Sequence, residues 1–154
     1  MTKEHHVEAF VQATVECFES MVDIVPERKD MRTQVPPIQN SDVCAIIGLS
    51  GESAGMVTIS FSAGVAKAVV GNFLGEDPAG LGDEDLYDAV GELINIIAGN
   101  GKAYVKDIAL SISLPSVMHG DKYYMSLPKS ASVTSVDFDL PGIGLMTMML
   151  SLVD

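Results

Sequence analysis

The segment that decides the fold is DEDLYDAVGELINIIAGNGKAYVK, residues 83–106. At about 100° per residue, its large apolar side chains fall on one side of a helix and its polar side chains on the other. We predict a long amphipathic helix here, with Asp83 as its N-cap and the acidic Glu84 and Asp85 in its first turn. The apolar side holds Leu86, Val90, Leu93, Ile97 and Tyr104, and the polar stripe holds Asp88, Glu92, Asn95, Gly99, Lys102 and Lys106.

The segments on either side of this helix alternate between helical and extended patterns. Apolar residues at spacings of three and four predict a helix over residues 4–25 and a shorter one over 64–74. Residues 27–42 are polar and carry no helix or strand pattern. The order of these segments indicates an α+β fold, in which helices pack on a largely antiparallel sheet. The predicted strands are 43–49 and 55–61, which form a hairpin, and then 111–114, 122–127, 132–140 and 144–153.

Length and composition limit the class of protein. The chain has 154 residues, of which 47% are hydrophobic, enough for one globular domain spanning residues 1–154. Its net charge of -12 would repel nucleic acid and anionic membranes. Cys17 and Cys44 are too few and too far apart for a metal knuckle or a redox pair. Because the N-terminus is charged and the apolar tail, 143–153, is too short to span a bilayer, we expect a soluble cytoplasmic protein.

Several residues that could suggest chemistry fail on spacing or surroundings. The run Gly-Asn-Gly-Lys at 99–102 lacks the earlier Gly and the following Ser or Thr of a phosphate-binding loop. His5 and His6 are adjacent, so on a helix they diverge by about 100°. His119 has no carboxylate at ligand spacing, so no metal site is expected. Cys44 lies in an apolar strand and is interpreted as a core residue.

The polar stripe of the long helix has two interpretations. It could be an ordinary solvated face, but such a face more often carries Glu, Lys, Gln and Ala than the poor helix formers Asn and Gly. Glu92 and Asn95 are three residues apart, so an anion and an amide project side by side. The missing side chains at Gly91 and Gly99 would let a partner's surface approach this pair.

The same residues resemble the signature of a known family. Residues 88–100, DAVGELINIIAGN, and the later ISLP at 112–115 are similar to the CheC/CheX/FliY phosphatases of bacterial chemotaxis, which have an Asp or Ser, then Glu-x-x-Asn, then a distant Pro. The predicted hairpin and closing strands also resemble that family, so the likeness covers most of the chain. CheC-type relatives present a second Glu-x-x-Asn on another helix. This sequence has none, which makes CheX the nearest branch and implies a CheC-like single domain.

The resemblance implies a response-regulator phosphatase that hydrolyses the aspartyl phosphate of a CheY-like protein in a two-component pathway. Glu92 and Asn95 would be the catalytic residues, with Asn95 orienting the attacking water and Glu92 pairing with a regulator Lys. The chain would need no cofactor of its own, because the regulator's active site supplies the Mg²⁺. The residues expected to contact the regulator are Asp88, Gly91, Gly99 and Lys102.

Two alternatives remain open. The first is a non-catalytic module that binds a response regulator without accelerating hydrolysis, and the second is a flagellar-switch component related to FliY. The exposure of Asn95 bears on the choice, because a catalytic amide must protrude and must lie outside any deep pocket. Asn100 serves as the contrast and is predicted to be buried and bonded to backbone.

The resemblance to CheX also implies a homodimer, which we expect to form through a sheet edge. Residues 144–153 contain no charge and no Pro, so an exposed edge of that composition would aggregate. They are predicted to lie centrally in the sheet or to pair with another chain. A charged segment such as 135–139 is a candidate for the outermost strand, and the sequence does not identify which strand makes the dimer contact.

Overall fold

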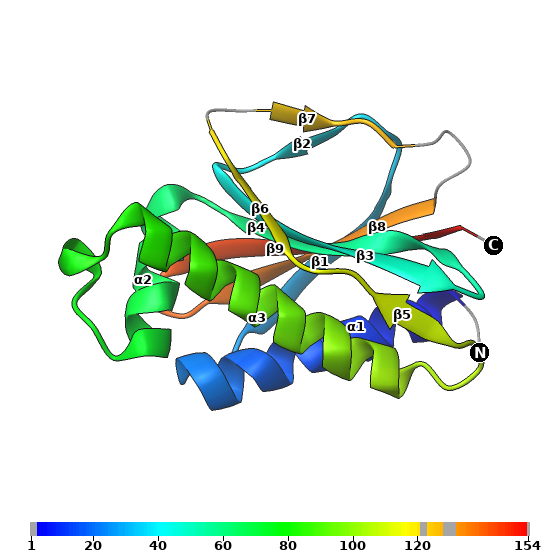
Figure 1. The fold of residues 1–154 in the computed structure, drawn as a ribbon, viewed down its shortest axis with the longest axis horizontal. Helices are drawn as coiled ribbons and strands as arrows, with labels where there is room; N and C mark the ends of the chain where they lie inside the picture. Colours follow the sequence, from blue (N-terminus) through cyan, green and yellow to red (C-terminus); the bar gives the residue numbers. More distant parts are fainter. Residues whose placement is uncertain (1–2, 121–122, 128–131, 154) are drawn as a thin grey trace.

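Three helices cover one face of an antiparallel sheet, and a two-stranded ribbon lies over the opposite face (Figure 1). The computed structural model describes residues 3–120, 123–127 and 132–153. The predicted α+β class, with helices packed on a largely antiparallel sheet, is confirmed. Among the described residues, no helix is both long enough and apolar enough to cross a membrane.

The helices begin and end close to the predicted positions. α1 is Lys3–Cys17, and it continues as a π-helical turn at Phe18–Val22. α2 is Ala63–Leu74, with the Ser62 side chain accepting a hydrogen bond from the Val65 amide as its N-cap. α3 is Asp83–Tyr104, and its N-cap is Gly82, so the prediction of Asp83 as N-cap is wrong by one residue. The carboxylates of Asp83, Glu84 and Asp85 all lie in the first turn, where the helix dipole favours them.

The strands form a seven-stranded sheet and a separate ribbon. The sheet has the order β1-β8-β9-β4-β3-β5, with β6 also paired to β3. The ribbon pairs β2 with β7. The bounds are β1 Glu27–Gln34, β2 Ile38–Asn40, β3 Val43–Gly51, β4 Ala54–Phe61, β5 Leu110–Ile112, β6 Ser116–His119, β7 Tyr123–Met125, β8 Ser132–Leu140 and β9 Gly144–Val153.

The largely apolar composition of β9, which carries no charge and no Pro, follows from its central place between β8 and β4. Met146, Met148 and Leu150 point to the helical face and join the main core. Met149 points to the opposite face, where it packs against Ile38 of the ribbon. The strand is thus buried on both faces, and the prediction of a central position is confirmed.

Three parts of the sheet differ from the predictions. β1 forms the outer edge beside β8, so the suggestion that 135–139 could be outermost is wrong. β1 falls in the polar stretch that carried no strand pattern, because its side chains are almost all exposed and do not alternate. β6 follows Pro115 directly and was also missed. Lys122, at the start of the predicted strand 122–127, lies outside the described residues.

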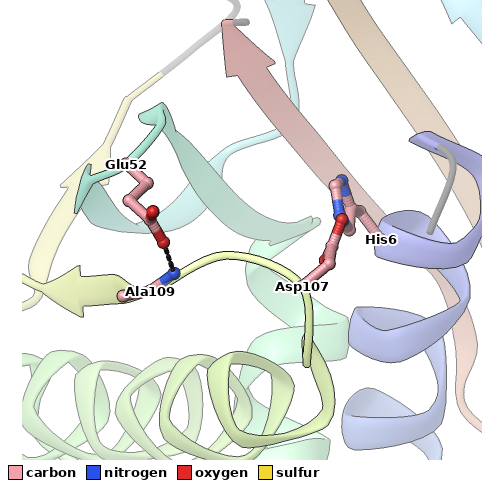
Figure 2. Close-up of polar contacts among 4 residues, drawn as sticks. All are labelled: His6, Glu52, Asp107 and Ala109. Atoms are coloured by element: carbon pink, nitrogen blue, oxygen red, sulfur yellow. Dashed lines mark hydrogen bonds and ion pairs between the residues drawn. The ribbon is translucent and has the colours of Figure 1, made fainter.

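Close packing and polar contacts fix the C-terminal half of α3. Phe10 of α1 is fully buried against Gly101, where an added Cβ would lie 2.3 Å from its ring. The loop after α3 is held from two sides (Figure 2). The His6 imidazole of α1 lies 2.9 Å from the Asp107 carboxylate, and the Glu52 carboxylate accepts a hydrogen bond from the Ala109 amide. These contacts set the direction in which the chain returns from α3 to the sheet.

Candidate functional site

The exposed side of α3 carries an acid and an amide next to each other. Asp88, Glu92 and Asn95 are all exposed, and they follow one another at helical spacings of four and three. The Glu92 and Asn95 side chains therefore project from neighbouring turns of one face. The predicted exposure and adjacency of this pair are confirmed. We call Asp88, Glu92 and Asn95 the α3 ridge.

The backbone beneath the α3 ridge is fixed by the core. Val90, Leu93, Ile94 and Ile97 on the buried side of α3 have no exposed surface. Close-packed side chains of this kind leave the helix little freedom to rotate or slide. The ridge therefore presents its carboxylate and amide from a rigid element rather than from a mobile loop.

A groove runs along one side of the α3 ridge. Its opposite wall is formed by Leu114 and Pro115, between β5 and β6, and by Val117 of β6. Leu114 is 88% exposed, an unusual position for a large aliphatic side chain. The groove is open to solvent, so Glu92 and Asn95 stand at its side and not inside a deep pocket.

Pro115 defines how closely this wall approaches the helix. Gly91 is buried, and a Cβ added there would meet the Pro115 ring at 3.7 Å and Val117 at 3.6 Å. The space next to Gly91 is therefore occupied by this chain's own Pro115 and not left open for a partner. The Gly99 position differs, because within the described part of the chain nothing lies within 4 Å of a Cβ built there.

A second hollow lies on the other side of the ridge. It is formed by Phe73 and Leu74 at the end of α2 and by Asp85, Asp88 and Glu92 of α3. Leu74 is exposed, so the ridge has an apolar side chain on each flank. Sequence reasoning missed both Leu74 and Leu114. The signal that could have found Leu114 is a large apolar residue directly before the signature Pro.

The remaining predicted contact residue lies apart from the ridge. Lys102 is exposed and ten residues beyond Glu92, about 15 Å along the helix axis at 1.5 Å per residue. It can contact a partner only if the partner's surface extends along α3. Asn100 is exposed, so the prediction that it would be buried and bonded to backbone is wrong. It lies five residues after Asn95, which on a helix places it well to one side of the ridge.

An aromatic stack connects α3 to the far wall of the groove. The rings of Tyr87 and His119 are parallel within 9°, with their centroids 4.4 Å apart. Tyr87 lines the groove beside Asp88, and His119 is the last residue of β6. Partial burial, and then the charge of Asp83, raise the pKa of the Tyr87 hydroxyl above its ordinary value.

The thiols cannot supply nucleophilic chemistry to this surface. Cys17 and Cys44 are buried, and burial raises the pKa of the Cys17 thiol to about 12. Within residues 3–120, 123–127 and 132–153, no three His, Cys, Asp or Glu side chains are grouped so that they could hold a metal ion. The exposed acid–amide pair is thus the chemical feature that the ridge offers to a partner.

Comparison with known proteins identifies similar chains. Residues 43–139 match the family model described as "Chemotaxis phosphatase CheX". A chemotaxis protein CheX from Desulfovibrio desulfuricans is 28% identical, with a TM-score of 0.85 over 96% of this chain and 98% of that chain. The CheX-CheY-BeF3-Mg²⁺ complex from Borrelia burgdorferi matches at 24% identity and a TM-score of 0.77, over 97% of this chain and 98% of that chain.

A more distant likeness is confined to the fold. Thermotoga maritima FliY superposes with a TM-score of 0.68 at 12% identity, over 100% of this chain and 91% of that chain. The chain matches no curated protein.

Proposed function

Because the chain belongs to the CheX family of chemotaxis phosphatases, we propose that it accelerates hydrolysis of the aspartyl phosphate on a CheY-like response regulator. The observation that carries this proposal is the exposed Glu92 and Asn95 pair on a rigid helix. A site that is completed by a partner protein has to protrude, and this pair does. The complex of CheX with CheY from Borrelia burgdorferi supports a partner of this kind.

The regulator would bring most of the chemistry to the complex. An acyl phosphate next to a bound Mg²⁺ already has its charge neutralised for phosphoryl transfer. Water attacks the phosphorus, the bond from phosphorus to the aspartyl oxygen breaks, and inorganic phosphate leaves with the carboxylate restored. A helper protein then needs only to place the water in line with the breaking bond.

Asn95 is suited to placing that water. Its amide has a carbonyl oxygen that accepts a hydrogen bond from water and an NH₂ group that donates to an oxygen of the phosphoryl group or the water. A side-chain amide neither gains nor loses a proton near neutral pH, so Asn95 would orient the water without acting as a base. The ridge would carry this amide into the regulator's active site.

Glu92 would fix the register of the two proteins. A carboxylate one turn away from the amide can pair with a cationic side chain beside the regulator's phosphoryl group. Asp88 extends the same acidic edge, and a lysine is the expected partner. The exposed Leu114 and Leu74 would bury apolar surface on the two flanks of the ridge, which adds affinity that does not depend on charge.

The direct test is the decay of a phosphorylated cognate regulator with and without this protein. We expect the phosphoryl half-life to shorten in proportion to a catalytic amount of protein. If the regulator binds but its half-life is unchanged, the non-catalytic binding module is correct. If the regulator neither binds nor decays faster, the proposed partner class is wrong.

A further inference from the structure

A polar cavity lies on the face of the sheet opposite the helices, beneath strand β2. Its floor is the outer side of β1, β8, β9 and β4, and its roof is the stretch 38–41. Its volume is about 170 Å³. The α3 ridge is on the other side of the sheet, so this cavity shares no residue with the proposed phosphatase site.

The floor of the cavity is built from hydroxyl groups. Register places Ser60 beside Thr147 on adjacent strands, and Met149 between Thr58 and Ser135 in the next row. Thr58, Ser60 and Ser135 are all buried. Alternation along a strand explains how they share one face, since the residues between them point into the main core. A sheet face that only packed against a ribbon would favour apolar residues at these positions.

The roof contributes an amide that lacks a partner. Asn40 is only 8% exposed and lines the cavity, and its Nδ2 makes no hydrogen bond to any residue in the described part of the chain. Buried polar groups are almost always hydrogen-bonded, so a donor left open next to a cavity points to a group that occupies the cavity. Ile38 of the same strand and Met149 of the floor add apolar surface beside it.

A positive group stands at the mouth. Arg32 of β1 lines the cavity with its side chain 43% exposed, and its Nη1 pairs with the Asp137 carboxylate. Asp137 also accepts a hydrogen bond of 2.7 Å from the Thr147 hydroxyl, so both Arg32 and Thr147 stabilise its negative charge. Of the polar groups around the cavity, Gln34 Oε1 already accepts a bond from Ser135. The Ser135 and Thr147 hydroxyls have thereby used their single hydrogens. The donors that line the cavity for a ligand are the Asn40 amide, the Thr58 and Ser60 hydroxyls, and the guanidinium N–H groups of Arg32 outside its pair with Asp137.

We propose that this cavity binds a small carboxylate. A planar carboxylate matches the planar amide of Asn40 and the guanidinium of Arg32, and its carbon end would lie against Ile38 and Met149. A dianion such as phosphate would meet about twice the repulsion from Asp137 and from the net charge of -12 that a singly charged carboxylate meets. An engineered cavity of about 150 Å³ accepts benzene, so 170 Å³ admits a ligand of roughly six non-hydrogen atoms.

The test is an NMR titration of the full chain with acetate and with pyruvate at constant ionic strength. Glycerol and phosphate serve as the comparison ligands. We expect saturable shifts at the backbone amides of 38–41 and 58–60, with a Kd on the order of millimolar or tighter for so small a ligand. The proposal would be overturned by shifts that do not saturate, by shifts at other surfaces, or by equal shifts with glycerol. The cavity would then hold only water.

Variants separate binding in the cavity from general charge effects. Asn40→Asp replaces the donor by an acceptor of the same size and should weaken carboxylate binding by about 10-fold or more. Asn100→Asp makes the same charge change at an exposed position of α3 and should leave the Kd unchanged. Equal Kd values for Asn40→Asp and the unaltered chain would contradict the proposal. If Asn40→Asp fails to fold, Thr58→Val can be used instead, because it removes a hydroxyl from the cavity floor and keeps the shape of the side chain. An unchanged Kd for the carboxylate in Thr58→Val would also contradict the proposal.

Discussion

At the scale of single residues, Asn95 and Asn100 have the same side chain but project from α3 in different directions. Both amides are exposed on α3. Asn95 stands on the ridge with Glu92 one turn before it and the groove beside it, whereas Asn100 projects to one side. A regulator docked on the ridge would meet the first amide and not the second. This pair therefore supplies a matched test of the proposed mechanism.

Replacing Asn95 by Ala should slow hydrolysis by on the order of 10²-fold while leaving binding of the regulator largely intact, because the amide acts mainly in the transition state. The measurement is phosphoryl decay at saturating regulator, with a separate binding titration. Asn100→Ala removes the same group elsewhere on α3 and should keep full activity. Full activity in Asn95→Ala would refute the role of the amide even though the family assignment would stand.

Replacing Glu92 by Ala should weaken docking as well as slow hydrolysis. An exposed ion pair that becomes desolvated in a complex is worth on the order of 1.5–3 kcal/mol as a charge-assisted hydrogen bond. We therefore expect the KM for the phosphorylated regulator to rise about tenfold or more, and the effect to diminish at high salt. A loss of turnover alone, with an unchanged KM at every salt concentration, would contradict the docking role.

The candidate site was predictable from residues 88–95 because helical spacing alone fixes which side chains share a face. What could not be predicted is the neighbourhood of that face. Gly91 was expected to admit a partner's surface. Pro115, which follows β5 in the chain, packs next to Gly91 and covers it. Leu74 and Leu114 likewise come to lie beside the ridge, and His119 stacks on Tyr87, through tertiary packing that no local pattern encodes.

At the scale of elements, two glycines of α3 have opposite environments. A Cβ at Gly101 would lie 2.3 Å from Cδ1 of the buried Phe10, whereas at Gly99, within the described residues, nothing lies within 4 Å. Gly101→Ala should therefore lower the free energy of unfolding by about 1–3 kcal/mol through overpacking. Gly99→Ala should raise it by up to about 1 kcal/mol through helix propensity.

Urea denaturation of the two variants measures both effects. Phosphoryl decay adds a second readout, because a regulator that approaches Gly99 closely would have a higher KM for the Gly99→Ala variant. Equal destabilisation by the two substitutions would show that α1 does not pack on Gly101 as described.

The tie between α1 and β1 makes stability depend on acid pH. Arg28 donates two hydrogen bonds of 2.8 Å to Glu8, and this bonding lowers the pKa of the Glu8 carboxyl. A carboxylate with a lowered folded-state pKa stabilises the fold above its unfolded pKa of about 4.3, and the gain is lost as pH falls through the folded value. Asp107, whose pKa is lowered by its hydrogen bond with His6, acts in the same direction.

We expect stability to fall as the pH drops below about 4.5, and Glu8→Gln to flatten part of that fall. At pH 7 the variant should lose only about 0.2–1 kcal/mol, because the pair is largely exposed. Thermal unfolding across this pH range measures both quantities. If Glu8→Gln lost stability at acid pH as steeply as the unaltered chain does, the Glu8–Arg28 pair would not persist in solution.

Helices and strands with a buried side could be predicted from the sequence, whereas strands without a buried side could not. The helices carry apolar side chains at helical spacing, and β3, β4, β8 and β9 are rich in apolar residues because the sheet is covered on one or both faces there. β1 is an edge strand whose charged side chains face solvent, so it carries no such pattern even though it pairs with β8 on both sides of an irregularity between Arg28 and Met31. β6 is four residues long and directly follows Pro115, so its sequence looks like part of a turn.

At the scale of the whole molecule, the sheet separates two surfaces with different chemistry. Helix α3 lies on one side of the sheet and strand β2 on the other (Figure 1). The helical side carries the α3 ridge, and the opposite side carries the hydroxyl-lined cavity beneath β2. The two edges of the sheet are also unlike. One edge is formed by β5 and β6, which flank Leu114 and Pro115 and so belong to the groove, and the other is β1.

This asymmetry limits how two copies of the chain could associate. A dimer through β5 or β6 would cover the wall of the groove and block access to Asn95. A dimer that forms by strand pairing and leaves both ridges free would use the β1 edge or the ribbon. β1 is the longer of these, and exposed apolar side chains at Val25, Met31 and Val35 lie along it or at its ends. We therefore expect a homodimer through the β1 edge.

Sedimentation at micromolar concentration should give twice the chain mass of 16.3 kDa. The double substitution Met31→Glu and Val35→Glu adds carboxylates to an already acidic edge, so it should shift the mass towards the monomer while the phosphoryl-decay rate per chain is retained. Leu74→Glu places a carboxylate at an exposed apolar position on the helical layer and should leave the mass unchanged. A monomer mass for the unaltered chain would exclude the dimer, and a dimer that resists the β1 substitutions would move the interface to the ribbon.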